Sequence, residues 1–266
     1  MDIINKSLLS NKKFILEDLM TKQRKNKWYH KLIIGLLSFI FLPILIFFIY
    51  ASQYYHAEPA VQDVLISNEA VQVETSDRLL TFTPTDKVPT TGIIFYPGAK
   101  VEATSYAPLM KDLAAKGYFC SIVKMPFNLA FFNMNAADPI VLEHPEIKSW
   151  YLSGHSLGGA MAASYISGHT DTFDGLILLA AYSTSDLTSS DLKVLTIYGS
   201  HDQVLNLTSL EKYAGNLPAS SETLILEGGN HAGFAYYGPQ KGDGTATLTQ
   251  AEQSKQTATA ISHFMQ

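Results

Sequence analysis

Short apolar segments rich in β-branched and aromatic residues alternate along the chain with stretches of helical pattern. Of all the features of the sequence, this alternation most narrows the range of possible folds. The strand-like segments are 92–97, 118–125, 149–154, 175–182, 194–200 and 222–228; the helical stretches are 105–116, 136–143, 157–167, 207–216 and 249–265. Strands that are apolar throughout are buried on both faces, which is typical of a parallel sheet covered by helices. Segments 71–75 and 79–84 predict a preceding hairpin. We therefore expect an α/β fold with a mostly parallel sheet over residues 61–266.

A second feature, the segment from Leu32 to Tyr50, contains 19 residues without a charge. As a helix it would be about 28 Å long, close to the hydrocarbon thickness of a bilayer. Trp28 and Tyr29 precede it, as aromatic residues at a membrane interface would. A buried core helix is the alternative, but core helices are rarely so long and so uniformly apolar. We expect one transmembrane helix over residues 32–50.

The charge distribution predicts the orientation of that helix. Residues 1–31 carry eight Lys or Arg and three acidic residues, a net charge of +5, whereas the remainder has a net charge of −10. Because basic residues accumulate on the cytoplasmic side, we expect a basic cytoplasmic tail over 1–31, a linker over 51–60, and the 61–266 domain outside the cell membrane. The length of the tail and of the apolar segment favours an uncleaved signal-anchor over a cleaved signal peptide.

Composition excludes several classes of function. A single cysteine, Cys120, cannot form an internal disulfide, and its apolar strand segment favours a packing role. The acidic outer domain has no basic stripe, which argues against nucleic acid as a partner. Its His, Cys and acidic residues lack the spacing of metal ligands, so we expect neither a metal nor a cofactor.

The motif Gly154-His155-Ser156-Leu157-Gly158 lies between a strand segment and a helical stretch. A bare G-x-S-x-G pattern is weak, but this setting is that of a nucleophilic serine on a sharp turn. Sites in parallel sheets form at the carboxyl ends of strands. Asp202 follows segment 194–200, and His231 follows segment 222–228. The order Ser, Asp, His is that of an α/β-hydrolase triad, so Ser156, Asp202 and His231 are our candidate catalytic residues.

The chemistry explains these residue types. A serine hydroxyl needs a base, and imidazole, whose unperturbed pKa is about 6.5, both accepts and returns a proton near neutral pH. Asp202 would orient His231 and stabilise the imidazolium. The tetrahedral oxyanion needs preorganised donors. We expect these to be the backbone N–H groups of Leu157 and Ala99, with Lys100 as the alternative to Ala99.

Other titratable residues compete for these roles. His155 is adjacent to Ser156 and is predicted to support the site rather than act as its base, and His201 is expected to be a loop residue. Asp186 and Asp191 suit turns and helix caps, and either is an alternative to Asp202. The histidines on or near predicted helices are expected at the surface: His144, His169 and His263.

Several segments together resemble the fold-5 group of α/β hydrolases, the dienelactone-hydrolase and carboxylesterase-like enzymes, many of them bacterial and membrane-anchored. They are "IIFYPGAKVEATSYAPLMKDLAAKGY", "VKMPFNLAFFN", "WYLSGHSLGGAMAASY", "VLTIYGSHDQV" and "EGGNHAGFAYYGPQKGDGTA". The resemblance spans roughly 61–266 and implies the same triad. Ala99 stands where related enzymes often have a second glycine, and its methyl group would narrow the acyl site.

Two loops are expected to form the walls of the site. Only about 11 residues (183–193) separate two strand segments where many α/β hydrolases insert a lid, so we expect no lid domain. Phe127, Phe131 and Phe132 are candidates for an apolar acyl pocket, with core packing as the alternative. Tyr236 and Tyr237 are candidates to close over the substrate. Asp243 is expected to cap a turn.

These observations favour a membrane-anchored extracytoplasmic serine hydrolase that cleaves a small carboxylic ester, or an amide, through an acyl-enzyme. An acyltransferase on the same fold is the first alternative, because the same triad could pass the acyl group to an acceptor other than water. A non-catalytic surface-binding module is the second, although no residue of the candidate triad is missing.

Overall fold

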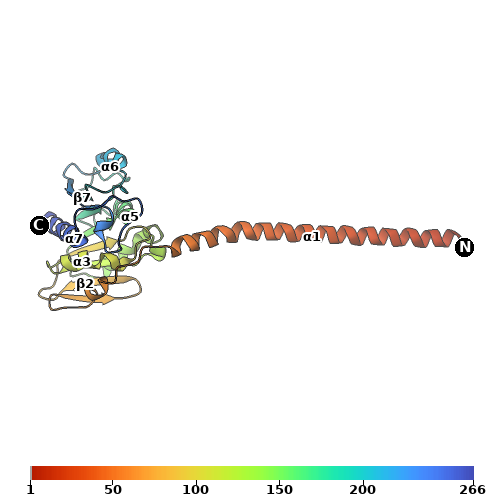
Figure 1. Ribbon diagram of the computed structural model, residues 1–266, viewed down its shortest axis with the longest axis horizontal. Helices are drawn as coiled ribbons and strands as arrows, with labels where there is room; N and C mark the ends of the chain where they lie inside the picture. Colours follow the sequence, from red (N-terminus) through yellow and green to blue (C-terminus); the bar gives the residue numbers. More distant parts are fainter. Residues whose placement is uncertain (1) are drawn as a thin grey trace. The chain divides into compact units, whose positions relative to one another are not determined.

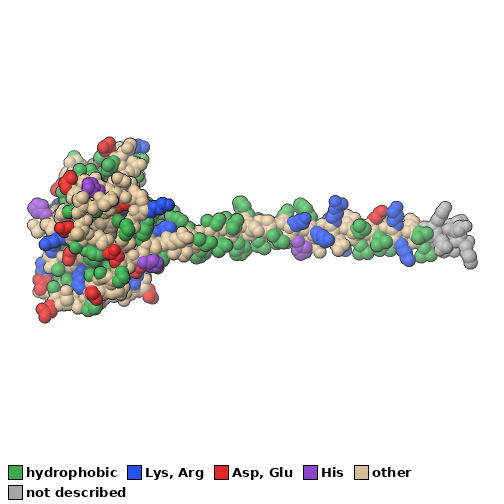
Figure 2. Space-filling model, viewed as in Figure 1, with side chains coloured by type: hydrophobic (Ala, Val, Ile, Leu, Met, Phe, Trp, Pro, Cys, Tyr) green, Lys and Arg blue, Asp and Glu red, His purple; other side chains and the backbone are tan. Residues whose placement is uncertain are grey.

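The computed structural model describes residues 2–266, with side chains from residue 8 onward. The chain divides into two units, Met1–Ser52 and Gln53–Gln266. The first contains one helix, α1 (Asp2–Ser52), without interruption at residue 31, where the tail was expected to end. Its part from Leu8 to Ser52 is long and apolar enough to cross a membrane, judged by length and composition. Figure 2 shows Lys and Arg in its N-terminal half and hydrophobic side chains in its C-terminal half.

The second unit is built on an eight-stranded sheet with the order β1-β2-β4-β3-β5-β6-β7-β8. Figure 1 labels two of these strands, β2 and β7. The strands are β1 (Val71–Thr75), β2 (Leu79–Pro84), β3 (Thr91–Tyr96), β4 (Phe119–Val123), β5 (Ser149–His155), β6 (Gly175–Leu179), β7 (Lys193–Gly199) and β8 (Glu222–Leu226). The hairpin β1–β2 and the pair β2–β4 are antiparallel, and the remaining pairs are parallel. The carboxyl ends of β3 to β8 therefore share one edge, where the site is expected.

Helices cover both faces of this sheet. The α-helices are α2 (Val61–Val64), α3 (Ala107–Ala114), α4 (Ala137–Glu143), α5 (Leu157–Ile166), α6 (Leu207–Tyr213) and α7 (Gln250–Phe264). The 3₁₀ helices are η1 (Ala103–Tyr106), η2 (Pro126–Asn128), η3 (Ala130–Ala136), η4 (Ala214–Asn216) and η5 (Ala232–Phe234). One apolar core joins the sheet to α3 and α7, and a second joins its other face to α4 and α5. The α/β fold expected from the sequence is confirmed.

The strands occur where the sequence predicts them, but several end earlier. β6 ends at Leu179 rather than at 182, because Ala180 adopts a left-handed φ of 48° that an extended strand cannot contain. β8 ends at Leu226, two residues before Gly228 with its φ of 76°. The helical stretches 105–116 and 207–216 each combine a 3₁₀ turn with a shorter α-helix.

The domain also includes residues that the sequence assigns to the linker. Tyr55 forms a parallel bridge with Val101, its N–H donates to the Lys100 carbonyl at 2.7 Å, and its own carbonyl accepts from Glu102 N–H at 2.9 Å. The Glu58 N–H donates to the Tyr236 carbonyl at 2.8 Å. The expected linker over 51–60 is thus fixed to the domain from Tyr55 onward.

Glycine permits a close contact between α5 and β3. A Cβ atom on Gly158, in the first turn of α5, would lie 2.1 Å from the Tyr96 carbonyl oxygen and 2.3 Å from that of Pro97. Both obstacles are backbone atoms, which cannot move without displacing the strand end. The start of α5 therefore depends on the absence of a side chain at residue 158.

We predict that Gly158→Ala lowers the free energy of unfolding by about 2 kcal/mol or more, since overpacking against rigid atoms costs about 1–3 kcal/mol. Gly168→Ala is the matched control, because the nearest atom to its added Cβ, the Tyr165 carbonyl oxygen, is 3.8 Å away. Thermal unfolding of the detergent-solubilised chain measures both variants. Equal stability of the two variants would contradict the packing argument.

Candidate active site

Ser156 occupies a strained turn between β5 and α5. Its φ of 52° and ψ of −123° are unfavourable for a residue with a side chain. Two backbone hydrogen bonds hold the turn: Ser156 N–H donates to the Leu179 carbonyl at 2.9 Å, and Ala160 N–H donates to the Ser156 carbonyl at 3.1 Å. A Cβ on Gly154 would lie 2.6 Å from backbone atoms of the following helix. The strained turn that the G-x-S-x-G motif predicts is therefore present.

Asp202 and His231 are in direct contact although they are 29 positions apart in the sequence. The Nδ1 of His231 lies 2.8 Å from Oδ2 of Asp202, and both side chains are buried. The other carboxylate oxygen accepts hydrogen bonds from the N–H groups of Val204 at 2.9 Å and Leu205 at 2.8 Å. With Nδ1–H donating to the carboxylate, a neutral His231 has its lone pair on Nε2, where a base accepts a proton.

The structure places Ser156 at the same sheet edge as this pair. The ring of its neighbour, His155, lies with its centroid 4.5 Å from that of His231. Among the described residues, no hydrogen bond joins the Ser156 hydroxyl to the His231 imidazole. Such contacts are often long in substrate-free enzymes and tighten when substrate binds.

Two residues that sequence reasoning did not assign to the site hold the loops that carry it. Gln253 on α7 is fully buried, and its amide accepts from Asn230 N–H at 3.0 Å and donates to the Asn230 carbonyl at 2.8 Å. Asp243 accepts from Ala232 N–H at 2.8 Å and from Gln203 N–H at 3.3 Å. Asp243 therefore joins the loop of His231 to that of Asp202, a larger role than the turn cap expected.

A buried network connects the turn at Ser156 to the loop after β3. Gly98 N–H donates to the Tyr106 hydroxyl at 3.0 Å, and this hydroxyl lies 2.8 Å from Nδ1 of His155. The Tyr106 hydroxyl thus contacts both the loop after β3 and the imidazole next to Ser156. Burial, reinforced by the nearby charge of His231 when protonated, holds the pKa of His155 well below its ordinary value. A lowered pKa favours the neutral form of His155, and its supporting role stays a prediction.

The backbone N–H groups considered as oxyanion donors, those of Leu157 and Ala99 and the alternative of Lys100, differ in whether they are already hydrogen-bonded. Lys100 N–H donates to the Asn128 carbonyl at 2.8 Å, so it is already engaged. In the part of the chain that the structure describes, Ala99 N–H has no protein acceptor. Leu157 is the first residue of α5, where no helical carbonyl is available to its N–H. This leaves Ala99 and Leu157 as the candidate pair.

The aromatic candidates for the pocket fall into two groups. Phe127, Phe131 and Phe132 are exposed and pack edge to face, with ring centroids 5.5 and 5.7 Å apart. Tyr237 is buried and its hydroxyl donates to Gln240 at 2.7 Å, whereas Tyr236 is half-buried. The phenylalanines are therefore not core residues, which was the alternative to a role at the site.

The remaining candidates occupy structural positions. Asp186 is exposed and accepts from the N–H and hydroxyl of Thr188, as in a turn. His201 contacts the Thr245 carbonyl through Nδ1 at 2.8 Å. Cys120 is buried in β4, and burial raises the pKa of its thiol.

Comparisons with known proteins agree with this geometry. Residues 92–255 match the model of the Alpha/beta hydrolase family. The chain belongs to this family. The family assignment drawn from the sequence motifs is therefore confirmed. Membership of this family supports hydrolysis as the class of reaction.

Several solved structures share the fold of this α/β hydrolase. A CIB-like hydrolase from Thermoplasma acidophilum is 17% identical with a TM-score of 0.55, and the alignment covers 74% of this chain and 99% of that one. Est1E from Butyrivibrio proteoclasticus is 12% identical with a TM-score of 0.54, covering 74% and 97%. TT1662 from Thermus thermophilus is 14% identical with a TM-score of 0.53, covering 74% and 98%. No curated protein matches the chain.

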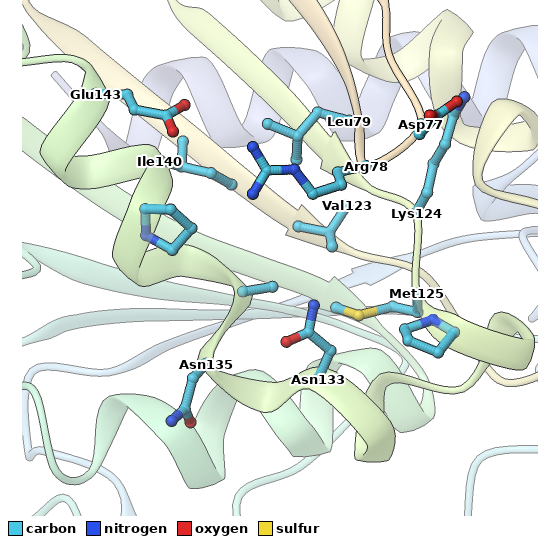
Figure 3. Close-up of a pocket in the computed structure, with 13 residues that line it drawn as sticks. Asp77, Arg78, Leu79, Val123, Lys124, Met125, Asn133, Asn135, Ile140 and Glu143 are labelled. Atoms are coloured by element: carbon cyan, nitrogen blue, oxygen red, sulfur yellow. The ribbon is translucent and has the colours of Figure 1, made fainter.

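A cavity of about 640 Å³ lies apart from the candidate triad of this hydrolase (Figure 3). The loop at the β1–β2 hairpin contributes Asp77 and Arg78 to its lining, and the segment after β4 contributes Met125 and Asn133. None of the three triad residues lines it. The segment that carries the exposed phenylalanines thus also forms part of this cavity.

We predict that His155→Asn reduces the loss of stability in acid. Because the pKa of His155 is lowered by folding, the unfolded chain binds a proton below about pH 6.5 that the folded chain does not. This removes about 1.4 kcal/mol of stability per pH unit as pH falls below that value, until the folded pKa is reached.

The measurement is chemical unfolding at pH 7.5 and pH 5.5 in detergent. Asparagine keeps an acceptor for Tyr106, and His263→Asn, at an exposed position of α7, is the control. An unchanged pH slope in His155→Asn would show that His155 is not the neutral buried group described above.

Proposed function

We propose that this α/β hydrolase is a membrane-anchored, extracytoplasmic serine hydrolase that cleaves a small carboxylic ester, or an amide, through an acyl-enzyme. The observation that carries the proposal is the buried hydrogen bond between Asp202 and His231 at the edge where Ser156 occupies its strained turn. A carboxylate, an imidazole and an activated serine at the carboxyl edge of a parallel sheet are the parts that acyl transfer requires.

In the proposed reaction, Nε2 of His231 takes the proton of the Ser156 hydroxyl as the oxygen attacks the ester carbonyl. The alcohol leaves with that proton when the tetrahedral intermediate collapses to the acyl-enzyme. Water then attacks the acyl carbon and gives a proton to His231, and the carboxylic acid is released as Ser156 regains its hydrogen. Asp202 stabilises the imidazolium formed in both steps.

Two backbone amides stabilise the oxyanion in this proposal. The N–H of Leu157 lies at the start of α5, where the helix dipole also favours negative charge. The N–H of Ala99 supplies the second donor from the loop after β3. Tyr106 positions this loop, because its hydroxyl accepts from the neighbouring Gly98 N–H.

The membrane anchor in this proposal is the apolar part of α1. The stretch from Leu8 to Ser52 has the length and composition to span a bilayer, and residues 1–31 carry a net charge of +5. Because basic residues favour the cytoplasmic side, residues 53–266 would lie outside the cell.

We predict that a fluorophosphonate probe labels the parent chain and not Ser156→Ala, because only an activated serine attacks the probe phosphorus. Ser167→Ala, which removes an exposed hydroxyl just after α5, is the control and should label normally. Ester turnover by Ser156→Ala should fall by several orders of magnitude. Absence of labelling in a folded parent chain would favour a non-catalytic binding module, and product diverted to an added alcohol would favour an acyltransferase.

We predict that Tyr106→Phe lowers kcat roughly ten- to a hundred-fold while KM changes little, since a displaced oxyanion donor acts on the transition state. The rate of fluorophosphonate labelling should fall in parallel. Tyr96→Phe is the control: it also removes a buried hydroxyl, which donates to the Met134 carbonyl at 2.6 Å and accepts from Ala137 N–H at 3.1 Å. If both variants lose stability but keep kcat, Tyr106 has no positioning role.

A further inference from the structure

The segment that leads into the domain is attached beside the candidate catalytic centre. Tyr55 is hydrogen-bonded to Lys100 and Glu102, on the loop that presents Ala99. Two residues later, Ala57 N–H donates to the Glu102 carboxylate at 3.1 Å, and Glu58 N–H donates to the Tyr236 carbonyl at 2.8 Å. The segment therefore runs from the loop that carries Ala99 to the loop that follows His231.

Chain length limits how far this edge can be from the end of the apolar segment. Tyr50 ends that segment, and Tyr55 follows five residues later. Five extended residues span at most about 17 Å. A domain of this size has a radius of gyration of about 17 Å and is about 40 Å across. The limit comes from covalent connection alone, so it holds for every arrangement of the two units.

Three exposed phenylalanines lie on the segment after β4, at the same edge of the sheet. Phe127, Phe131 and Phe132 have exposed fractions of 43%, 64% and 46%. Their segment is joined to the loop that carries Ala99 by the hydrogen bond from Lys100 N–H to the Asn128 carbonyl. Phe127 and Asn128 have φ values of 57° and 53°, an unfavourable region for a bulky side chain. Backbone strain that presents apolar rings to solvent indicates a surface used for binding.

The opposite edge of the sheet is different. Val88, in the segment before β3, is 74% exposed, but its neighbours in the chain include Asp86 and Lys87. No apolar cluster accompanies it among the exposed residues from 85 to 90. Aromatic rings favour the interface between water and lipid, whereas charged groups oppose burial in it. Residues 85–90 thus lack the exposed aromatic cluster that residues 127–132 carry.

We propose, resting on the serine hydrolase of the proposed function but replacing its small ester, that the carboxyl edge of the sheet lies on the membrane surface and that the substrate is a lipid ester held in that leaflet. The three phenylalanines enter the boundary between headgroups and acyl chains, and the ester carbonyl reaches Ser156 from the lipid side. Water cleaves the ester to a fatty acid and an alcohol, as in the reaction above. The described residues between Leu179 and Lys193 form no helix, so the segment where many α/β hydrolases insert a lid carries no helical lid here.

The first experiment measures contact with lipid in the full chain reconstituted in phosphatidylcholine and phosphatidylglycerol vesicles. A tryptophan is introduced by Phe131→Trp or, as the matched control on the opposite edge, by Val88→Trp, both in a Trp28→Phe background. We expect brominated phosphatidylcholine to quench the fluorescence gained in Phe131→Trp and not that gained in Val88→Trp. Equal quenching, or none in Phe131→Trp, would overturn the proposed surface.

The second experiment tests the substrate with a fluorogenic diacylglycerol ester in the vesicles and p-nitrophenyl acetate in solution. A 20-residue Gly-Ser insertion between Ser52 and Gln53 should lower turnover of the lipid ester roughly ten-fold and leave the soluble ester unchanged, because it lowers the effective concentration of the edge at the membrane. The same insertion after Lys87 is the control and should change neither rate.

The outcomes separate the two proposals. Hydrolysis of p-nitrophenyl acetate without hydrolysis of the lipid ester, or lipid turnover unaffected by the longer tether, would overturn the lipid substrate and leave the serine hydrolase intact. Failure on both esters together with no fluorophosphonate labelling would overturn the serine hydrolase itself, and the quenching result would still decide the membrane-facing surface.

Discussion

The carboxylate of Asp202 is buried, and the rest of the candidate site depends on the hydrogen bonds that compensate for its lost hydration. A buried carboxylate is costly unless its oxygens are hydrogen-bonded. Two backbone amides satisfy one oxygen, and the imidazole of His231 satisfies the other. The same contacts fix the plane of the carboxylate, which in turn fixes the tautomer of His231. The parallel sheet makes this possible, because neighbouring strands bring both loops to one edge.

The imidazole of His155 lies close to that of His231, so simultaneous protonation of the two rings is unfavourable. If His155 were protonated together with His231, two positive charges would face each other across 4.5 Å between ring centroids. Burial, with the charge of a protonated His231, holds the pKa of His155 well below its ordinary value, and the Tyr106 hydroxyl lies 2.8 Å from its Nδ1. Under the proposed function, the positive charge that forms during turnover is therefore left to the imidazole that Asp202 contacts. The Tyr106 hydroxyl also accepts from Gly98 in the loop of Ala99, so one tyrosine connects both sides of the candidate site.

Much of this arrangement could be predicted because it follows from local patterns. Apolar periodicity located all eight strands, and the rule that sites form at carboxyl ends selected Asp202 and His231 from the many acidic and histidine residues. Strand ends were less predictable. Alanine rarely adopts a left-handed φ, so the residue type at position 180 does not indicate that the chain turns there. The contacts of Tyr106 and Gln253 could not be found either, since they join residues 49 and 23 positions apart. Their existence depends on how helices pack on the sheet.

The position of Gln253 along the chain has a consequence for how the molecule matures. The loop of His231 is bonded at Asn230 by a side chain that belongs to α7, and α7 follows all three triad residues in the order of synthesis. A nascent or truncated chain ending before Gln250 would contain Ser156, Asp202 and His231 and still lack the support that fixes the base. Under the proposed function, the three residues alone are thus an incomplete site, and the loop of the proposed base is fixed only once α7 has docked.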